Sequence, residues 1–253
     1  MLAMSTHPPA SPPHTRVALV TVADAGLGRA VARQLSEAGM TVYAGTRCDE
    51  AGRAAERELR HVRLDLDDDA TVARAAEMVE RSSGRLDVLV NMVGLTASLG
   101  GAAGGPRDDF RAVFETNLLD ALHLMTVTNA MFPLLRRSPA GRVVNVASAF
   151  QAPARTGDTA PRNTVEALTL QYAVMGRPDG VLVNAVCVEA DVHAWDGFEE
   201  DRALRRAAEL PVRLALAEDL LLTATSTGPD GVCAELSTEG PGDGNGAGTI
   251  RVV

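Results

Sequence analysis

The sequence predicts an α/β fold in which helices cover both faces of a parallel sheet. Three observations support this prediction: short Val-rich apolar runs alternate with amphipathic helical segments, the connections between them are short, and aromatic residues make up only 3% of the chain. A core filled by Val, Leu, Ala and Met suits a sheet that is buried on both faces. With 253 residues and 46% apolar composition, the chain can bury one large core, so we expect a single domain.

The N-terminal half alternates predicted strands and helices. Strands are predicted at 17–22, 41–45, 61–64 and 86–91, and helices at 29–39, 67–84 and 108–136. The first strand is joined to the first helix by the small-residue turn ADAGLG, and a Gly/Ala-rich loop precedes the long third helix. Strand, turn and helix therefore repeat as βα units.

The C-terminal half continues the alternation. Strands are predicted at 142–147, 180–186 and, more weakly, 231–236, and helices at 164–175, 202–210 and 213–224. Repeated βα units with short connections require right-handed crossovers, which produces a Rossmann-type, doubly wound parallel sheet of seven strands. We expect this domain to span 16–237, with a disordered N-terminal tail at 1–15 and a flexible C-terminal tail at 238–253.

Composition and charge exclude several function classes. All 24 basic residues are arginine, and the formal charge of -9 repels nucleic-acid backbones, so we expect no nucleic-acid partner. The three cysteines and five histidines have no metal-ligand spacing, and we predict no metal site. The first residues lack the basic start and apolar run of a secretory signal. The sequence also has no uninterrupted run of about eighteen apolar residues, so we predict no membrane span. We therefore expect a cytoplasmic protein.

The turn after the first strand is the first candidate binding site. Backbone N–H groups at the start of the following helix form an anion site, and Gly26 and Gly28 would let a dinucleotide pyrophosphate approach the backbone closely. The alternative is steric, because a tight turn from strand to helix needs glycine in any case. After the second strand, Arg47 offers a cation for a 2′-phosphate, which favours NADP; the alternative is a solvated surface arginine.

At this point the chain resembles the short-chain dehydrogenase/reductase family from Val17 to about Leu236. The stretch TVADAGLG resembles the family's T-G-x-x-x-G-x-G turn, with Val22 in place of the first glycine. The stretch NMVG at 91–94 resembles the family's N-N-A-G motif, and an aspartate closes the third strand where the family contacts adenine. The resemblance thus implies that the following residues bind the cofactor: Thr21, Gly26, Leu27, Gly28, Arg47, Asp65, Asn91 and Gly94.

The family's catalytic tetrad is only half retained. Asn117 in ETNLLDAL matches its asparagine, and Ser148 at the end of GRVVNVAS matches its serine. The family's Y-x-x-x-K motif aligns with DTAPR, which places Asp158 at the tyrosine and Arg162 at the lysine. Neither is equivalent, because an aspartate is already ionised at neutral pH and an arginine would favour that ionised form further. The only two tyrosines of the chain are Tyr43, in the second predicted strand, and Tyr172, about three turns into the helix predicted at 164–175. We expect both to lie out of reach of Ser148.

The resemblance implies three possible functions. The first is a non-catalytic or weakly catalytic partner of an intact family member, with which it assembles through helices 108–136 and 162–176. Two-subunit NADP-dependent reductases of this kind act on small or carrier-protein-bound substrates in antibiotic biosynthesis. Such a chain would be a pseudoenzyme in a hetero-oligomer, although the same helices could form a homo-oligomer. The second is an autonomous oxidoreductase that uses Ser148 and Asn117 without the tyrosine and loses a factor of about 10² to 10⁴ in rate. The third is a cofactor-free cyclase, isomerase or lyase in which Ser148, Asp158 or His193 serves as a polar group; a lone loop histidine is usually a solvated residue.

Overall fold

The computed structural model of the chain describes residues 15–47, 58–93, 106–148, 164–188, 197–217, 223–227, 232–235 and 251–252. Its strands are β1 (Val17–Val20), β2 (Thr41–Thr46), β3 (Arg60–Arg63), β4 (Val88–Val93), β5 (Arg142–Ser148), β6 (Leu182–Val188), β7 (Thr225–Thr227), β8 (Val232–Glu235) and β9 (Arg251–Val252). Its helices are α1 (Gly26–Glu37), α2 (Asp69–Ser83), α3 (Pro106–Leu135), α4 (Thr164–Gly176) and α5 (Gly197–Leu216), with a short 3₁₀ helix η2 (Arg177–Asp179) after α4.

All the strands form one sheet, in the order β3-β2-β1-β4-β5-β6-β7-β8-β9. The first seven strands in this order are parallel to their neighbours, while β8 and β9 add an antiparallel edge. The predicted doubly wound fold with a parallel sheet is therefore confirmed. The strand order reverses at β1 and β4, since the chain first builds outward to β3 and then returns to the other side of β1.

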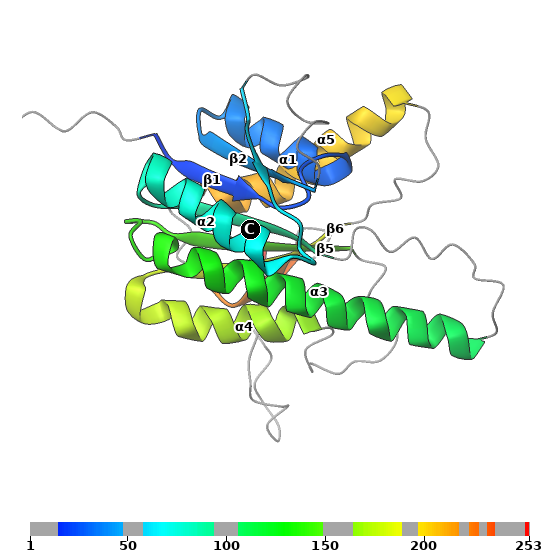
Figure 1. Cartoon of the computed structure of the whole chain (residues 1–253). Coiled ribbons are helices and arrows are strands. Elements are labelled where there is room, and N and C mark those ends of the chain that lie inside the picture. Colours follow the sequence, from blue (N-terminus) through cyan, green and yellow to red (C-terminus); the bar gives the residue numbers. More distant parts are fainter. Residues whose placement is uncertain are drawn as a thin grey trace, which may run out of the picture.

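Helices lie on both faces of the sheet, with α1 and α5 on one face and α2, α3 and α4 on the other (Figure 1). Alternate residues of each strand supply the two cores, because successive side chains of a strand point to opposite faces. In β1, Val17 and Leu19 pack in the core under α2, α3 and α4, whereas Ala18 and Val20 pack in the core under α1 and α5. Burial on both faces explains why the strands are continuous apolar runs.

Two predictions for the C-terminal part are wrong. The helix predicted at 213–224 ends at Leu216, and the seventh parallel strand is Thr225–Thr227, not the segment at 231–236. That later segment forms β8, which runs antiparallel to β7. Ala224, immediately before β7, has a φ of 56°, a left-handed conformation that no helix contains. The apolar spacing of 213–224 is helical, so the local pattern gave no sign of this break.

Helix α3 contains an apolar stretch, Leu118–Leu135, that by length and composition alone is sufficient to cross a membrane, and half of this stretch is buried inside the fold. Its fully packed residues include Leu124, Val127, Met131 and Leu135, whose spacing follows one face of a helix. Packing against the sheet accounts for this apolar face.

At the amino edge of the sheet, the buried carboxylate of Asp87 accepts hydrogen bonds from neighbouring segments of the chain. This carboxylate accepts hydrogen bonds from the Val17 backbone N–H at 2.7 Å, from Ser138 Oγ at 2.6 Å and from Arg85 Nε at 3.0 Å. The strand ends that carry the predicted site residues lie at the opposite, carboxyl edge.

Candidate functional site at the carboxyl edge of the sheet

Most of the predicted site residues that the structure describes follow the carboxyl ends of parallel strands or lie near them. Thr21 follows β1, Arg47 follows β2, Asp65 lies just after β3, Asn91 is in β4 and Ser148 ends β5. Because these strands are parallel, their carboxyl ends meet at one edge of the sheet, beside the point where the strand order reverses. In open α/β sheets this is the edge where ligands bind.

The turn between β1 and α1 keeps the geometry of a glycine-rich turn. Val22 stands where the family has its first glycine, and its φ of 50° is a left-handed conformation that is a rare outlier for a β-branched residue. Gly26 is also left-handed, with a φ of 55°, and a Cβ added to it would meet no heavy atom within 4 Å. A Cβ on Gly28 would instead overlap the carbonyl oxygen of Val22. The turn itself therefore requires both glycines, Gly28 because a Cβ would overlap Val22 and Gly26 because of its left-handed φ, and the open side of Gly26 also leaves room for a ligand.

The start of α1 suits an anionic ligand such as a pyrophosphate. The residue before the helix, Ala25, has no side chain that can cap the first-turn N–H groups. Unsatisfied N–H groups and the helix dipole together attract negative charge. The backbone of Gly26, Leu27 and Gly28 would hold the pyrophosphate of a dinucleotide, while the Leu27 side chain is buried in the core. These residues fit the nucleotide that the fold implies.

Thr21 and Asn91 have structural hydrogen bonds in the described part of the chain. Thr21 fastens β1 to β4, since its N–H donates to the Val90 carbonyl at 3.0 Å and its Oγ1 accepts from the Met92 N–H at 2.8 Å. Asn91 Nδ2 donates to Thr128 Oγ1 at 3.1 Å and to Asn145 Oδ1 at 2.9 Å, which ties β4 to α3 and β5. The buried Oδ1 of Asn91 has no hydrogen-bond partner among the residues that the structure describes. The predicted Gly94 lies outside the described residues.

This buried polar network continues from β5 into α4. Asn145 Nδ2 donates to Thr169 Oγ1 at 2.8 Å, and Thr169 Oγ1 donates to the Val165 carbonyl at 2.7 Å. The sequence analysis did not identify Asn145, Thr128 or Thr169, because a single polar residue in an apolar run carries no signal of its partner.

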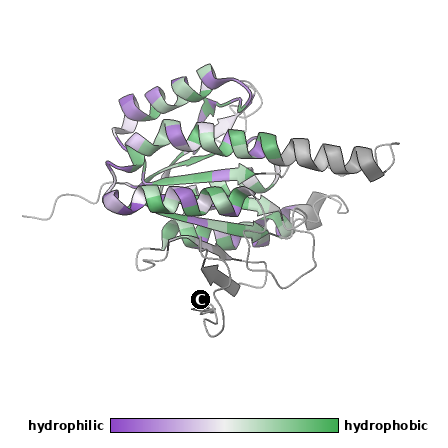
Figure 2. Ribbon diagram, turned by 90° about the horizontal axis from the view of Figure 1, so that it is seen from below, coloured by the Kyte–Doolittle hydropathy of each residue, from purple (hydrophilic) through white to green (hydrophobic). Residues whose placement is uncertain are grey.

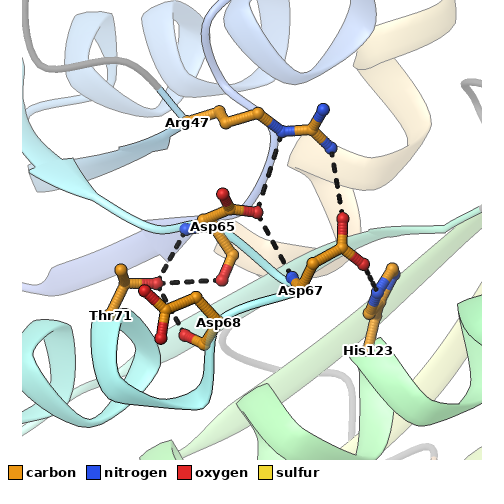
Figure 3. A network of polar contacts seen from close by, with 6 residues as sticks. All are labelled: Arg47, Asp65, Asp67, Asp68, Thr71 and His123. Carbon is orange, nitrogen blue, oxygen red and sulfur yellow. Dashed lines mark hydrogen bonds and ion pairs between the residues drawn. The ribbon is translucent and has the colours of Figure 1, made fainter.

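Arg47 and Asp65 lie together at the end of β2 and β3 (Figure 3). Arg47 Nε is 3.8 Å from Asp65 Oδ1, and Arg47 Nη2 is 3.9 Å from Asp67 Oδ2. Asp67 Oδ1 also contacts His123 Nε2 of α3 at 2.9 Å. Arg47, for which the sequence offered either a 2′-phosphate contact or a solvated surface position, therefore lies between two carboxylates, and its side chain is 66% exposed.

The turn before α2 is organised by the residues around Asp65. Asp68 caps the helix, because its Oδ1 accepts from the Ala70 N–H at 3.0 Å, in agreement with the acidic start predicted for this helix. The Thr71 hydroxyl bonds to the backbone of Asp65, at 2.9 Å from its N–H and 2.8 Å from its carbonyl. The roles of Asp67 and His123 were missed, since the two residues are far apart in the sequence and only the packing of α2 against α3 brings them together.

The predicted catalytic residues are described only in part. Ser148 is the last residue of β5, where its backbone is in register with Val188 of β6, and Asn117 lies within α3. Asp158, Arg162 and His193 lie outside the described residues. Within the described residues, no group of three or more His, Cys, Asp or Glu side chains could hold a metal ion.

Both tyrosines of the chain are held in hydrogen bonds away from Ser148. The Tyr172 hydroxyl lies between α4 and α3, where it donates to Asn129 Oδ1 at 2.9 Å and contacts the Met125 carbonyl at 3.3 Å. Burial raises the pKa of the Tyr172 phenol, which is the opposite of what a catalytic proton donor needs. The Tyr43 hydroxyl pairs with Ser83 Oγ at 2.8 Å and accepts from Arg60 at 3.1 Å.

Comparisons with known proteins agree with this fold. A family model described as short chain dehydrogenase matches residues 16–190. The relatives include two streptomycete proteins named "putative ketoacyl reductase". One, from Streptomyces coelicolor, is 30% identical over 226 residues, covering 78% of this chain and 84% of that protein. The other, from the monensin polyketide synthase of Streptomyces virginiae, is 32% identical over 188 residues, covering 68% and 69%.

Solved structures share the fold. The complex of RhlG with NADP from Pseudomonas aeruginosa superposes with a TM-score of 0.66 at 25% identity and covers 84% of this chain and 94% of that one. The match to the family model extends over the β1 turn, the β3 end and the β5 end described above. The chain is therefore a member of the short-chain dehydrogenase family.

Proposed function

We propose that this chain is the partner subunit of an intact short-chain reductase, within an NADP-dependent oxidoreductase that acts on a carbonyl or hydroxyl group in secondary (antibiotic) metabolism. In this proposal the intact subunit supplies the proton donor and NADP, and this chain contributes little or no chemistry of its own. The observation that carries the proposal is the position of the two phenol groups: Tyr172 is held between α3 and α4, and Tyr43 is held against Ser83.

Carbonyl reduction needs a group that protonates the oxygen as hydride arrives. In the family this is a tyrosine whose pKa is lowered by a lysine, and the present chain has no lysine at all. Without such a donor, the rate is expected to fall by a factor of about 10² to 10⁴. Asn117 and Ser148 could still orient a carbonyl, which is why weak activity is compatible with the proposal.

The surface of α3 and α4 supports the partner role. These helices pack side by side, as the contacts of Tyr172 and the Phe132–Tyr172 ring pair at 6.1 Å indicate. Green, apolar segments run along both helices where they face the viewer in Figure 2. All but one of the exposed large apolar side chains of the described residues lie on them, and we call this set the α3–α4 apolar face: Leu118, Leu119, Leu122, Met125, Val174 and Met175.

Helix α4 is apolar round most of its circumference, with Thr164 and Gln171 as its exposed polar residues, although it lies at the outside of the molecule. Val174 is 65% exposed and Met175 45% exposed, while Val165 and Leu168 on the inner side are buried. A helix that is apolar all round is normally buried, so its outer side is expected to be covered by another chain. The matching helices of an intact family member are the occupant that we propose.

The metabolic setting rests on the relatives. Two of them are named as ketoacyl reductases of streptomycetes, one within the monensin polyketide synthase. The arginine-only composition is compatible with a GC-rich genome of that kind. We therefore propose a small or carrier-protein-bound acyl substrate for the complex.

The test is co-expression of the chain with an intact short-chain reductase of the same host. We expect the two chains to co-purify and the complex to reduce a ketoacyl substrate, while this chain alone shows no reduction above background. Leu122→Asp and Val174→Asp should abolish co-purification, because each places a charge within an apolar contact. Met78→Asp, on α2, is the control for an exposed apolar residue outside the α3–α4 apolar face, and it should leave the complex intact.

A serine variant separates this proposal from an autonomous enzyme. Ser148→Ala in this chain should leave the activity of the complex within about twofold, since the intact subunit carries the chemistry. Reduction of a carbonyl by the isolated chain, together with its loss in Ser148→Ala, would contradict the proposal. Turnover without any nucleotide would contradict it in favour of a cyclase or isomerase.

A further inference from the structure

We infer that the nucleotide edge of this chain selects an adenine nucleotide without a 2′-phosphate, and that Asp67 is the residue that decides this. The inference rests on the nucleotide-binding edge of the family fold. It is independent of the partner role, because the pocket of this subunit can differ in ligand from that of an intact partner.

The contacts of Arg47 lead to this inference (Figure 3). Its guanidinium group faces two carboxylates, with Nε 3.8 Å from Asp65 and Nη2 3.9 Å from Asp67. A phosphate that used Arg47 would have to compete with both carboxylates for the same N–H groups. The sequence alone left two possibilities for Arg47, a 2′-phosphate contact or a solvated surface arginine, because neither carboxylate is its neighbour along the chain.

Asp67 has a second partner that orients its carboxylate beside Arg47. Its Oδ1 is held by His123 Nε2 at 2.9 Å, so that the carboxylate bridges α3 and the end of β2. Its backbone N–H donates to Asp65 Oδ1 at 3.3 Å, which keeps the two aspartates together. The carboxylate of Asp67 is thus oriented by His123 on one oxygen and lies near Arg47 with the other, while its side chain is 63% exposed.

The charge balance opposes a phosphate at this position. One arginine faces Asp65 and Asp67, and Asp68 and Asp69 follow at the start of α2, where Arg74 lies 4.0 Å from Asp68. A 2′-phosphate would add about two negative charges to this group. A ribose 2′-hydroxyl adds none, and it can donate a hydrogen bond to a carboxylate, as the ribose of unphosphorylated dinucleotides does. The described residues therefore do not fit a 2′-phosphate and do fit a free hydroxyl.

The test is calorimetric titration of the full chain with two pairs of ligands, NADH with NADPH and 5′-AMP with 2′,5′-ADP. The unmodified chain should bind the ligand without the 2′-phosphate about tenfold more tightly in each pair. Asp67→Asn should reduce this preference by about tenfold, because it removes the charge that competes for Arg47. Asp69→Asn is the matched control, since it removes an equal charge two residues away and has no contact with Arg47 that the structure records.

The outcomes are distinct from those of the partner experiment. Tighter binding of the 2′-phosphorylated ligands by the unmodified chain would overturn the inference, and so would an equal effect of Asp67→Asn and Asp69→Asn. Binding of neither ligand pair would also overturn it, while co-purification with an intact reductase would still support the proposed function. If the preference is found but no complex forms, the inference stands and the partner role fails.

Discussion

Replacing Gly28 with alanine should destabilise the fold severely, although alanine is the better helix former. In an unconstrained helix, glycine to alanine stabilises by about 1 kcal/mol. At Gly28, however, the new Cβ would overlap the carbonyl oxygen of Val22 and come within 2.9 Å of its carbonyl carbon. Ordinary contacts between carbon atoms are about 3.5 Å or longer, so the turn and the helix must separate by at least about 0.6 Å.

No side chain can rotate to relieve this overlap. The backbone on one side of Val22 is fixed by the Thr21 N–H bond to Val90, and on the other by the Ala23 N–H bond to Gly45 at 2.8 Å. The helix must therefore move, and with it the buried side chains of α1 that pack on the sheet. Overpacking of this kind costs about 1 to 3 kcal/mol, and more where backbone resists, so we expect a loss of about 3 kcal/mol.

Gly26→Ala is the matched control, since it lies two residues away in the same turn. Its Cβ would meet nothing within 4 Å, and only the left-handed φ of 55° opposes the change, which costs about 1 to 2 kcal/mol. Urea unfolding followed by circular dichroism measures both losses. Equal losses for the two variants, or a Gly28→Ala protein as stable as the wild type, would refute the steric argument.

Two further predictions concern the strained turn and the buried phenol. Val22→Gly should leave the free energy of unfolding within about 1 kcal/mol of wild type, because relief of the left-handed strain offsets the lost side chain. The control Val20→Gly, in the core, should lower the free energy of unfolding by about 3 kcal/mol. Comparable losses for the two variants in urea unfolding would contradict this prediction. Since burial raises the pKa of Tyr172 above 10.0, its stabilising contribution is complete below that pH and is lost as the pH rises through the folded-state pKa. Stability should consequently fall more steeply above pH 10 in the wild type than in Tyr172→Phe, and parallel urea midpoints between pH 9 and 12 would refute the assignment.

The sequence was sufficient to predict most of the fold. The β1–α1 turn, the predicted helix at 67–84 and the strands of the central sheet follow from spacing that is local along the chain, and the structure has them within a few residues of the predicted ends. The prediction failed at 213–224, where the helical spacing of apolar residues continues past the end of α5, and the sequence pattern did not predict β7 directly after it. A short strand such as Thr225–Thr227 is decided by its pairing with β6, which local spacing does not encode.

The sequence by itself also determined that the chain has no lysine and only two tyrosines, so it cannot contain the family's tyrosine–lysine pair. Only the tertiary structure decided what the retained residues do. Arg47 at the end of β2 lies near the carboxylates of Asp65 and Asp67, which follow β3. Asp67 also contacts His123, which lies 56 residues further along the chain in α3. The physical reason is range: backbone periodicity acts between near neighbours, whereas ion pairs and hydrogen bonds join whichever groups the packed sheet and helices bring within a few ångströms.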